Sequence, residues 1–436
     1  MTQTKPVPTG ATRPKVVIVG AGFAGLAAAK ALHRMPVQVT VVDQHDYHTF
    51  TPFLYQVATA LLEADAAAFP VRGELRRLGN VSFRLATVTG VDLDAKAVDT
   101  DQGRLPYDYL VLAAGAVNAY FGHPEIAEHS LGLNDLPEAL QLRNAILARL
   151  EAAAWTRDPA ERARLLGFAV VGGGPTGTEF AGALAELVAG TLARDFPGLD
   201  RSEVSITLAE ASPHPLSVFP QPLPAAADRA LHHKGVRVRS GAMVAEVGKT
   251  GLRLKNGATV PAATVVWAAG VRASHLADGL GLALGSHKRI TVTPTLQVDG
   301  HPEVFAVGDV AEIRQPGGGR PLPMLAQVAI QSGRQAGRNI GALLRGEIPQ
   351  PFRYKDLGTM ATVGRGFAVA GIGPVRLTGQ AGFLAWLVVH IARIAGMRNR
   401  GLVLANWVSG YLFRNRPVRL IVGPREAGHA QLQHQR

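Results

Sequence analysis

Residues 16–29 have the sequence VVIVGAGFAGLAAA, in which β-branched residues are followed by three glycines and then by alanines. The β-branched run predicts a buried strand and the alanine-rich run predicts a helix. Gly20 would allow the tight turn between them, Gly22 would let a phosphate approach the backbone, and Gly25 would let the helix pack closely on the strand. The next predicted strand ends at Asp43, whose carboxylate can accept hydrogen bonds from ribose hydroxyls. The pattern predicts a βαβ unit that binds a dinucleotide rather than glycines used for packing alone.

The same plan recurs later in the chain. Residues 170–180 have the sequence VVGGGPTGTEF, where Gly172, Gly174 and Gly177 repeat the glycine spacing. The strand after this second helix is predicted to end at Glu210, and an acidic side chain there would repel a 2′-phosphate and hold a 2′-hydroxyl. This favours NADH over NADPH. Two such units in one chain predict one tightly held FAD and one nicotinamide nucleotide that binds and leaves.

The chain of 436 residues contains no cysteine. Redox disulfides, thiolate nucleophiles and cysteine-ligated iron–sulfur clusters are therefore excluded, so any redox chemistry must belong to a bound organic cofactor. The histidines form no metal-binding pattern, and we expect no metal. No apolar leader precedes the first strand, which favours a cytosolic location, and the longest apolar stretch, 382–397, is too short to span a bilayer.

Nearly all of the net charge of +12 lies near the C-terminus. Residues 351–436 contain twelve arginines and lysines but only two acidic side chains, Asp356 and Glu426. Two apolar stretches, 382–397 and 401–413, lie among these arginines, and such a combination attracts anionic lipid headgroups. It predicts attachment to one face of a membrane. The alternative is a pair of core or dimer-interface helices with solvated arginines. The two interpretations are compatible, because a dimer could present both C-terminal regions on one face.

The order of the motifs resembles that of the flavoproteins with two dinucleotide-binding domains. Within them it is similar to the type II NADH dehydrogenases, single-subunit NADH:quinone oxidoreductases of the membrane surface. The segments that carry the resemblance are VVIVGAGFAGL, DYHTFTPFLYQVATA, VVGGGPTGTEFAGALAE, VFAVGDVA, PLPMLAQVAIQSGRQAGRNI and YKDLGTMATVGRGFAVA. The implied fold is α/β, with two Rossmann-like domains of the glutathione-reductase type and a C-terminal membrane-associating helical region.

The resemblance also implies a domain plan and a set of partners. Residues 1–125 and 288–350 would form a discontinuous FAD-binding domain, 126–287 an NADH-binding domain, and 351–436 a region for membrane attachment and dimerisation. FAD would be tightly bound, with NADH and a membrane quinone as substrates. We expect a homodimer on an anionic membrane surface, at the cytoplasmic face of the cell membrane, with no nucleic acid as a partner and no proton pumping.

Several flavin-site residues follow from the resemblance. Asp309, in VFAVGDVA, would hydrogen-bond the ribityl chain. Pro52 and Leu54 would lie near the flavin ring, although a simple buried loop would also explain them. Gln327 and Gln331 are one helical turn apart, and the family places their segment beside the flavin at the quinone pocket; capping or solvent-exposed amides are the alternative.

Two more glycines are expected to line the cofactors. Gly115 follows the predicted strand in YLVLAAGA, and Gly270 follows the similar strand in TVVWAAGV.

Glu179 follows the last glycine of the second turn. A carboxylate in the first turn of a helix is partly explained by the helix dipole. The resemblance instead implies a place between nicotinamide, flavin and quinone, where Glu179 would position the nicotinamide and relay protons. Family members often have a lysine near GIGPVRLTG, where this chain has Arg376. Because arginine does not release a proton at neutral pH, proton delivery from that position is in doubt.

Two other functions are weighed against this one. An NADH-dependent ferredoxin or rubredoxin reductase would suit a basic surface but has no need of tryptophan- and leucine-rich segments beside the arginines. A flavin-containing protein that binds nucleic acid is disfavoured because no nucleic-acid motif is present.

Overall fold

The computed structural model describes residues 13–315, 317–394, 397–412 and 418–422 of the chain. The chain forms two compact units, each assembled from three segments. Unit 1 comprises Met1–Thr49, Ala68–Ala119 and Val271–Leu357, and unit 2 comprises Phe50–Ala67, Tyr120–Gly270 and Gly358–Arg436.

These packing units differ in extent from the expected cofactor domains. Phe50–Ala67 lies within the expected FAD-binding domain but packs as part of unit 2. The C-terminal segment from Gly358 onward also belongs to unit 2 rather than forming a unit of its own. The expected boundaries describe cofactor binding rather than packing, and they stay a prediction.

A six-stranded sheet forms the core of unit 1. Its strands, in spatial order, are β20 (Gln297–Val298), β21 (His301–Ala306), β9 (Tyr109–Leu112), β1 (Lys15–Val19), β2 (Gln38–Asp43) and β5 (Val81–Leu85). All neighbours from β21 to β5 are parallel, and only β20 pairs antiparallel. Residues 16–19 of the central strand β1 are buried, as is typical of an interior parallel strand.

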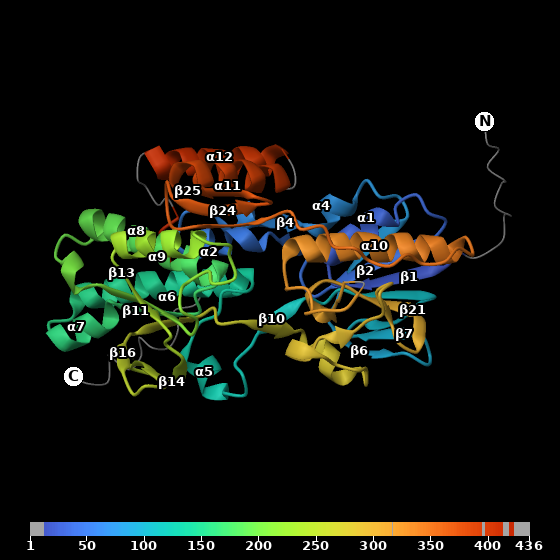
Figure 1. Ribbon diagram of the computed structural model, residues 1–436, viewed down its shortest axis with the longest axis horizontal. Helices are drawn as coiled ribbons and strands as arrows, with labels where there is room; N and C mark the ends of the chain where they lie inside the picture. The colour runs from blue at the N-terminus through green and yellow to red at the C-terminus, as the bar shows by residue number, and fades with distance from the viewer. Residues whose placement is uncertain (1–12, 316, 395–396, 413–417, 423–436) are drawn as a thin grey trace. The chain divides into compact units, whose positions relative to one another are not determined.

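Two helices, α1 (Phe23–Ala31) and α10 (Ala326–Leu344), lie side by side in unit 1 (Figure 1). Their backbones approach closely because glycines face the contact. A Cβ on Gly333 would lie 2.1 Å from the carbonyl oxygen of Ala24, and one on Gly337 would lie 2.7 Å from the Cβ of Ala31. Gln327 and Gln331, expected to be one helical turn apart, both lie in the first turns of α10.

The remaining elements of unit 1 are short. They are β3 (Tyr47–Thr49) paired with β4 (Ala68–Pro70), α4 (Val71–Leu75), the meander β6 (Val88–Asp92), β7 (Ala97–Thr100) and β8 (Gly103–Pro106), the antiparallel pair β10 (Ala116–Asn118) and β18 (Val271–Ala273), the parallel pair β19 (Ile290–Thr291) and β22 (Ala311–Glu312), and the 3-10 turns η3 (His275–Gly279), η4 (Ser286–Lys288) and η5 (Gly308–Val310).

Unit 2 repeats the βαβ plan. Its parallel sheet has the order β13 (Val236–Ser240), β12 (Ser205–Glu210), β11 (Gly167–Val171) and β17 (Thr264–Trp267). Helix α8 (Pro175–Asp195) connects β11 to β12, as α1 connects β1 to β2. The α/β fold with two Rossmann-like domains is therefore confirmed.

Other elements surround this sheet within unit 2. They are η1 (Thr51–Phe53), α2 (Leu54–Ala58), α3 (Ala64–Ala67), α5 (Pro124–His129), α6 (Leu136–Trp155), α7 (Pro159–Leu165), η2 (Arg201–Glu203), α9 (Leu223–His233), the meander β14 (Val244–Gly248), β15 (Gly251–Leu254) and β16 (Thr259–Pro261), and a second meander β23 (Thr359–Thr362), β24 (Ala368–Ile372) and β25 (Val375–Thr378).

The two apolar C-terminal stretches form the helices α11 (Gly379–Arg393) and α12 (Met397–Leu412), which lie alongside each other over β24 (Figure 1). Each helix exposes apolar side chains one turn apart, namely Leu384 and Val388 on α11 and Leu404 and Val408 on α12. Over the described residues, no helix has the length and hydropathy that a membrane span requires.

The inner faces of these two helices are aromatic. Trp386 on α11 and Trp407 on α12 are both buried, and their rings lie 5.6 Å apart between centroids. The tryptophans of the apolar stretches therefore pack inside unit 2 rather than on its surface. Tyr411 and Phe413 lie outside what is described of side chains.

Candidate functional site

The first glycine turn has the shape that close backbone approach demands. Gly20 has φ +105°, and a Cβ on it would lie 2.3 Å from the carbonyl oxygen of Ala113. A Cβ on Gly25 would lie 1.8 Å from the carbonyl oxygen of Gly20, so only glycine lets α1 meet the turn. Gly22, in contrast, has no atom within 4 Å of its Cβ position. The helix N-terminus is therefore open to a phosphate group.

Two side chains, Asp43 and the buried His48, hold this turn in place. Asp43 accepts the backbone N–H of Ala21 at 2.6 Å and that of His45 at 2.8 Å. His48 Nδ1 lies 3.2 Å from the carbonyl oxygen of Ala21, and burial lowers the pKa of His48 to about 4. The imidazole is therefore neutral at pH 7 and donates to that carbonyl, so both polar groups of Ala21 are engaged.

Asp309 is a polar group of this region that no described residue satisfies. It lies in η5, directly after Gly308, whose Cβ position is 3.0 Å from the Cβ of Ala24 in α1. The buried Oδ1 of Asp309 has no hydrogen-bond partner among the residues that the structure describes. Burial raises the pKa of Asp309 to about 6, although the charge of Arg289 partly opposes this. A buried carboxylate without a donor is costly unless a ligand supplies one.

FAD fits these residues. The open Gly22 turn suits a pyrophosphate, Asp43 ends β2 where a ribose is bound in such folds, and the unsatisfied Asp309 can accept from a ribityl hydroxyl. Among the described residues, no group of three or more His, Cys, Asp or Glu side chains could hold a metal ion.

The second glycine turn in unit 2 has the same geometry as the first. A Cβ on Gly172 (φ +103°) would lie 2.4 Å from the carbonyl oxygen of Ala268, and one on Gly177 would lie 1.9 Å from that of Gly172. Gly174 has open space at its Cβ position. Glu210 accepts the backbone N–H groups of Gly173 and, at 2.6 Å, Ser212. It thus takes the part that Asp43 takes in unit 1.

Gly115 and Gly270 follow corresponding strands in the two units. Gly115 has φ +69° with open space around its Cβ position, and Gly270 has φ +150° with the ring of Phe121 at 3.4 Å. Both backbones are in the left-handed region that favours glycine.

Glu179 lies just beyond the first turn of α8, which begins at Pro175 and has no acidic residue in that turn. The expectation of a first-turn carboxylate is therefore wrong, and the helix dipole explains less of the presence of Glu179. Its Oε1 accepts the backbone N–H of Thr362 at 3.1 Å. Burial raises the pKa of Glu179 to about 8, and the hydrogen bond from the backbone of Thr362 acts against this rise. The buried Nε1 of Trp386 has no hydrogen-bond partner among the described residues.

Gln327 and Gln331 bind the backbone of an extended segment of unit 1. Gln331 accepts the N–H of Lys355 at 3.0 Å and donates to its carbonyl oxygen at 2.9 Å. Gln327 Oε1 accepts the N–H of Leu357 at 3.1 Å. The two amides lie on one face of α10, as their spacing predicts, and they belong to unit 1 whereas Glu179 belongs to unit 2.

Three further expected positions have local explanations. Pro52 lies in η1, and Leu54 begins α2 and is buried within unit 2. Arg376 donates to the carbonyl oxygens of Gly373 and Val375, so its guanidinium closes the turn between β24 and β25.

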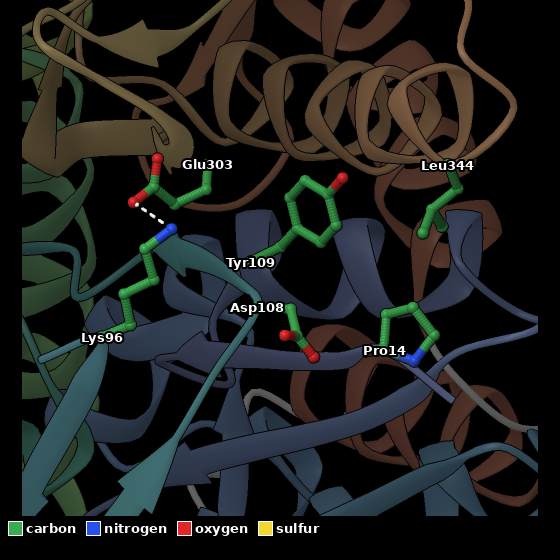
Figure 2. A pocket seen from close by; sticks show the side chains of 6 residues that line it. All are labelled: Pro14, Lys96, Asp108, Tyr109, Glu303 and Leu344. Atoms are coloured by element: carbon green, nitrogen blue, oxygen red, sulfur yellow. Dashed lines mark ion pairs between the residues drawn. The ribbon is translucent and has the colours of Figure 1, made fainter. Parts of the chain in front are cut away.

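Figure 2 shows a hollow of about 410 Å³ in unit 1. Its lining residues are Pro14, Lys96, Asp108, Tyr109, Glu303 and Leu344. Pro14 and Tyr109 lie at the amino ends of β1 and β9, whereas ligands of parallel sheets bind at the carboxyl ends. Lys96 and Glu303 also pair with each other at 3.0 Å, so this hollow is not the dinucleotide site.

Comparison with known proteins identifies the family. Residues 14–333 match the model of the pyridine nucleotide-disulphide oxidoreductases. The type II NADH:quinone oxidoreductase Ndh of Mycobacterium tuberculosis is 38% identical over 429 residues, which are 95% of this chain and 91% of that protein. This chain belongs to the type II NADH:quinone oxidoreductases. A second member of the family from the same organism, NdhA, is 40% identical over 421 residues, covering 93% of this chain and 88% of NdhA.

A solved structure agrees with this family at the level of the fold. NDH2 from Plasmodium falciparum, determined in complex with NADH, superposes with a TM-score of 0.87 at 18% identity, covering 94% of this chain and all of that one. The wider family is named for disulphide chemistry, yet this type II chain contains no cysteine and must work without a protein thiol.

Sequence reasoning missed the residues that surround Glu179 and the first glycine turn. Thr362 and Trp386 contact or influence Glu179 from segments far along the chain, and no local motif marks them. His48 lay in a quoted motif, DYHTFTPFLYQVATA, but its contact with Ala21 depends on tertiary folding.

Proposed function

We propose that this chain uses bound FAD to oxidise NADH and reduce a quinone by two electrons, with Glu179 as the group that manages the protons. The observation that carries the proposal is a buried carboxyl, with a pKa raised by burial to about 8, on the helix that begins at the second glycine turn. A group that titrates near neutral pH can accept and release a proton during turnover. Family membership gives the overall reaction, and the residues give the roles below.

FAD would be held by unit 1 residues. We assign Gly20, Gly22 and Gly25 to the pyrophosphate, Asp43 to the ribose and Asp309 to the ribityl chain. Bound FAD supplies two-electron exchange between a nicotinamide and a quinone. Gly115, in its left-handed conformation, would let the backbone lie against the same cofactor. In these terms residues 1–125 and 288–350 form the FAD-binding domain.

NADH would be held by residues 126–287. Gly172, Gly174 and Gly177 would face its pyrophosphate, and the carboxylate of Glu210 would accept from its ribose hydroxyls. A 2′-phosphate would meet the negative charge of Glu210, so NADPH would bind less tightly. Gly270 would allow close approach of the nicotinamide half.

We assign Pro52, Leu54, Gln327 and Gln331 to the surroundings of the flavin ring and the quinone. The two glutamines support this assignment because their hydrogen bonds fix the backbone of the segment that contains Lys355 and Leu357. This ordered segment would line the space that the flavin ring or the quinone ring occupies. Arg376 is unsuited to deliver protons, both because of its chemistry and because it closes a local turn.

The C-terminal helices would attach the protein to the cytoplasmic face of the cell membrane. Support comes from the exposed side chains of Leu384, Val388, Leu404 and Val408 on α11 and α12. Not every arginine of this region faces solvent: Arg400 donates to the carbonyl oxygens of Ala392 and Ile394, and Arg419 pairs with Asp195 at 3.0 Å. Anionic lipids would meet the remaining positive charge, including Arg393. We also propose a homodimer.

The acceptor specificity and the role of Glu179 can be tested together. NADH oxidation should be rapid with a short-chain quinone and slow with ferredoxin, which would be the favoured acceptor under the alternative function. Glu179→Gln should slow quinone-dependent turnover by on the order of 10²-fold while retaining flavin. Unchanged turnover in this variant would contradict the role of Glu179.

A further inference from the structure

A continuous line of hydrogen bonds crosses unit 2 and ends at Glu179. The indole N–H of Trp407 on α12 donates to Gln56 Oε1 at 2.8 Å. Gln56 Nε2 donates to the hydroxyl of Tyr55 at 2.9 Å, and that hydroxyl lies 2.8 Å from Thr362 Oγ1. The backbone N–H of Thr362 then donates to Glu179 Oε1 at 3.1 Å. The line joins helices α12, α2 and α8 through strand β23.

The Trp407 end of this line fixes the direction of its hydrogens. An indole nitrogen can only donate, so the Gln56 amide must turn its oxygen to Trp407 and its NH₂ to Tyr55. The NH₂ of Gln56 can only donate, so the Tyr55 hydroxyl accepts from it and has its own hydrogen to donate to Thr362 Oγ1. These bonds therefore polarise one another in the same sense, toward Thr362, whose backbone N–H donates to Glu179.

The line is shielded from water. Gln56 is fully buried, and Tyr55, Thr362, Trp407 and Glu179 are each less than a tenth exposed. A buried polar network is stable only when its members are satisfied, so a broken link cannot be repaired by solvent. Aromatic rings pack against it: Phe53 lies 5.6 Å from Trp407 and 6.1 Å from Trp386, centroid to centroid.

We propose that Tyr55, Gln56 and Trp407 are positioning residues that hold a polarised donor on Glu179 and thereby link the ionisation of its carboxyl to the placement of helix α12. This rests on the proposed function of Glu179 in proton handling. Because the line favours the ionised carboxylate, it opposes the effect of burial. Helix α12 also carries the exposed Leu404 and Val408, so the helix that would meet a membrane is the one from which the line begins.

Tyr55→Phe tests the middle of the line, because it deletes one hydroxyl and keeps the ring. We expect the apparent pKa of Glu179 to rise by roughly 0.5–1 unit. It should be measured in the flavin-loaded protein from the infrared C=O band of the protonated carboxyl, identified by its loss in Glu179→Gln. The limb of the turnover-against-pH profile that Glu179→Gln abolishes should move by the same amount.

Tyr107→Phe is the matched control. Tyr107 is a buried tyrosine of unit 1 whose hydroxyl has no hydrogen-bond partner among the described residues. Its loss should leave the apparent pKa of Glu179, measured from the infrared band, unchanged. Trp407→Phe tests the α12 end of the line. It should raise the apparent pKa of Glu179 by a smaller amount than Tyr55→Phe does, because Gln56 loses the partner that fixes its orientation.

The outcomes separate this inference from the proposed function. If Glu179→Gln slows turnover but the apparent pKa of Glu179 is the same in Tyr55→Phe as in Tyr107→Phe, the line does not act on Glu179 and the inference is overturned. An unchanged apparent pKa of Glu179 in Trp407→Phe overturns the link to α12. Unchanged turnover in Glu179→Gln would instead contradict the proposed function, whatever the band does.

Discussion

The carboxylate of Glu179 accepts the backbone N–H of Thr362 at 3.1 Å, across 183 positions of sequence. This bond joins the helix that begins at the second glycine turn to a strand that precedes the C-terminal helices. The glycine turn before Glu179 can be recognised in the sequence, whereas the contact with Thr362 depends on the tertiary fold.

The burial of Glu179 predicts a pH-dependent stability difference. Its pKa is about 8 in the folded protein against 4.5 for an unperturbed glutamate, so the folded state keeps a proton that the unfolded chain gives up. This group therefore disfavours folding progressively as pH rises from about 4.5 to 8. Glu179→Gln lacks the effect, and its Tm advantage over the parent should grow by a few degrees between pH 5 and pH 8. A Tm difference that does not change with pH would show that the carboxyl is not desolvated.

Asp309 should have opposite effects on flavin binding and on stability. Its buried Oδ1 has no hydrogen-bond partner in the described part of the chain, so Asp309→Ala should stabilise the flavin-free form against thermal unfolding. The same change should weaken FAD binding by roughly 10- to 100-fold, since a charge-assisted hydrogen bond is lost. The flavin-to-protein ratio after dialysis and the Tm of the flavin-free form measure both. Full flavin retention would refute the assignment to the ribityl chain.

Nucleotide preference should follow the charge at Glu210. Replacing it by serine and adding Ser212→Arg removes a repulsion and offers a cation to a 2′-phosphate. The ratio of kcat/KM for NADPH to that for NADH should rise at least about 10-fold. Ser212→Arg alone is the control and should shift the ratio less. A ratio equal to that of the parent in the double variant would remove Glu210 from the nucleotide site.

Membrane attachment should depend on the outer face of α11. Leu384 and Val388 are 61% and 66% exposed, and replacing both by glutamate should abolish sedimentation with anionic vesicles. The control replaces Trp155 and Ile348, which are 86% and 81% exposed in other elements, and should still sediment. Equal sedimentation of the two double variants would show that the α11 face does not bind lipid.

The glycine turns and their acidic strand ends could be predicted from the sequence because each depends on local geometry. Gly20 and Gly172 need positive φ, and Gly25 and Gly177 leave no space for a Cβ, so residue type and spacing alone reveal them. The two C-terminal helices were predictable for the same reason, from apolar stretches of sufficient length.

The surroundings of Glu179 could not be predicted, because the line of hydrogen bonds that ends there is built from three separate segments. Tyr55, Thr362 and Trp407 are ordinary residues in their own elements, and their hydrogen-bonding roles follow only from tertiary packing. The burial of Trp386 and Trp407 likewise depends on which face of each helix meets the rest of unit 2.

The most direct test of the account is anaerobic mixing of the flavin-loaded protein with NADH, followed by a short-chain quinone. We predict that the flavin absorbance bleaches with one equivalent of NADH and returns when the quinone is added, with both steps fast enough to support steady-state turnover. A flavin that NADH does not bleach, or that the quinone does not reoxidise, would contradict the central claim that the two dinucleotide sites serve one electron transfer.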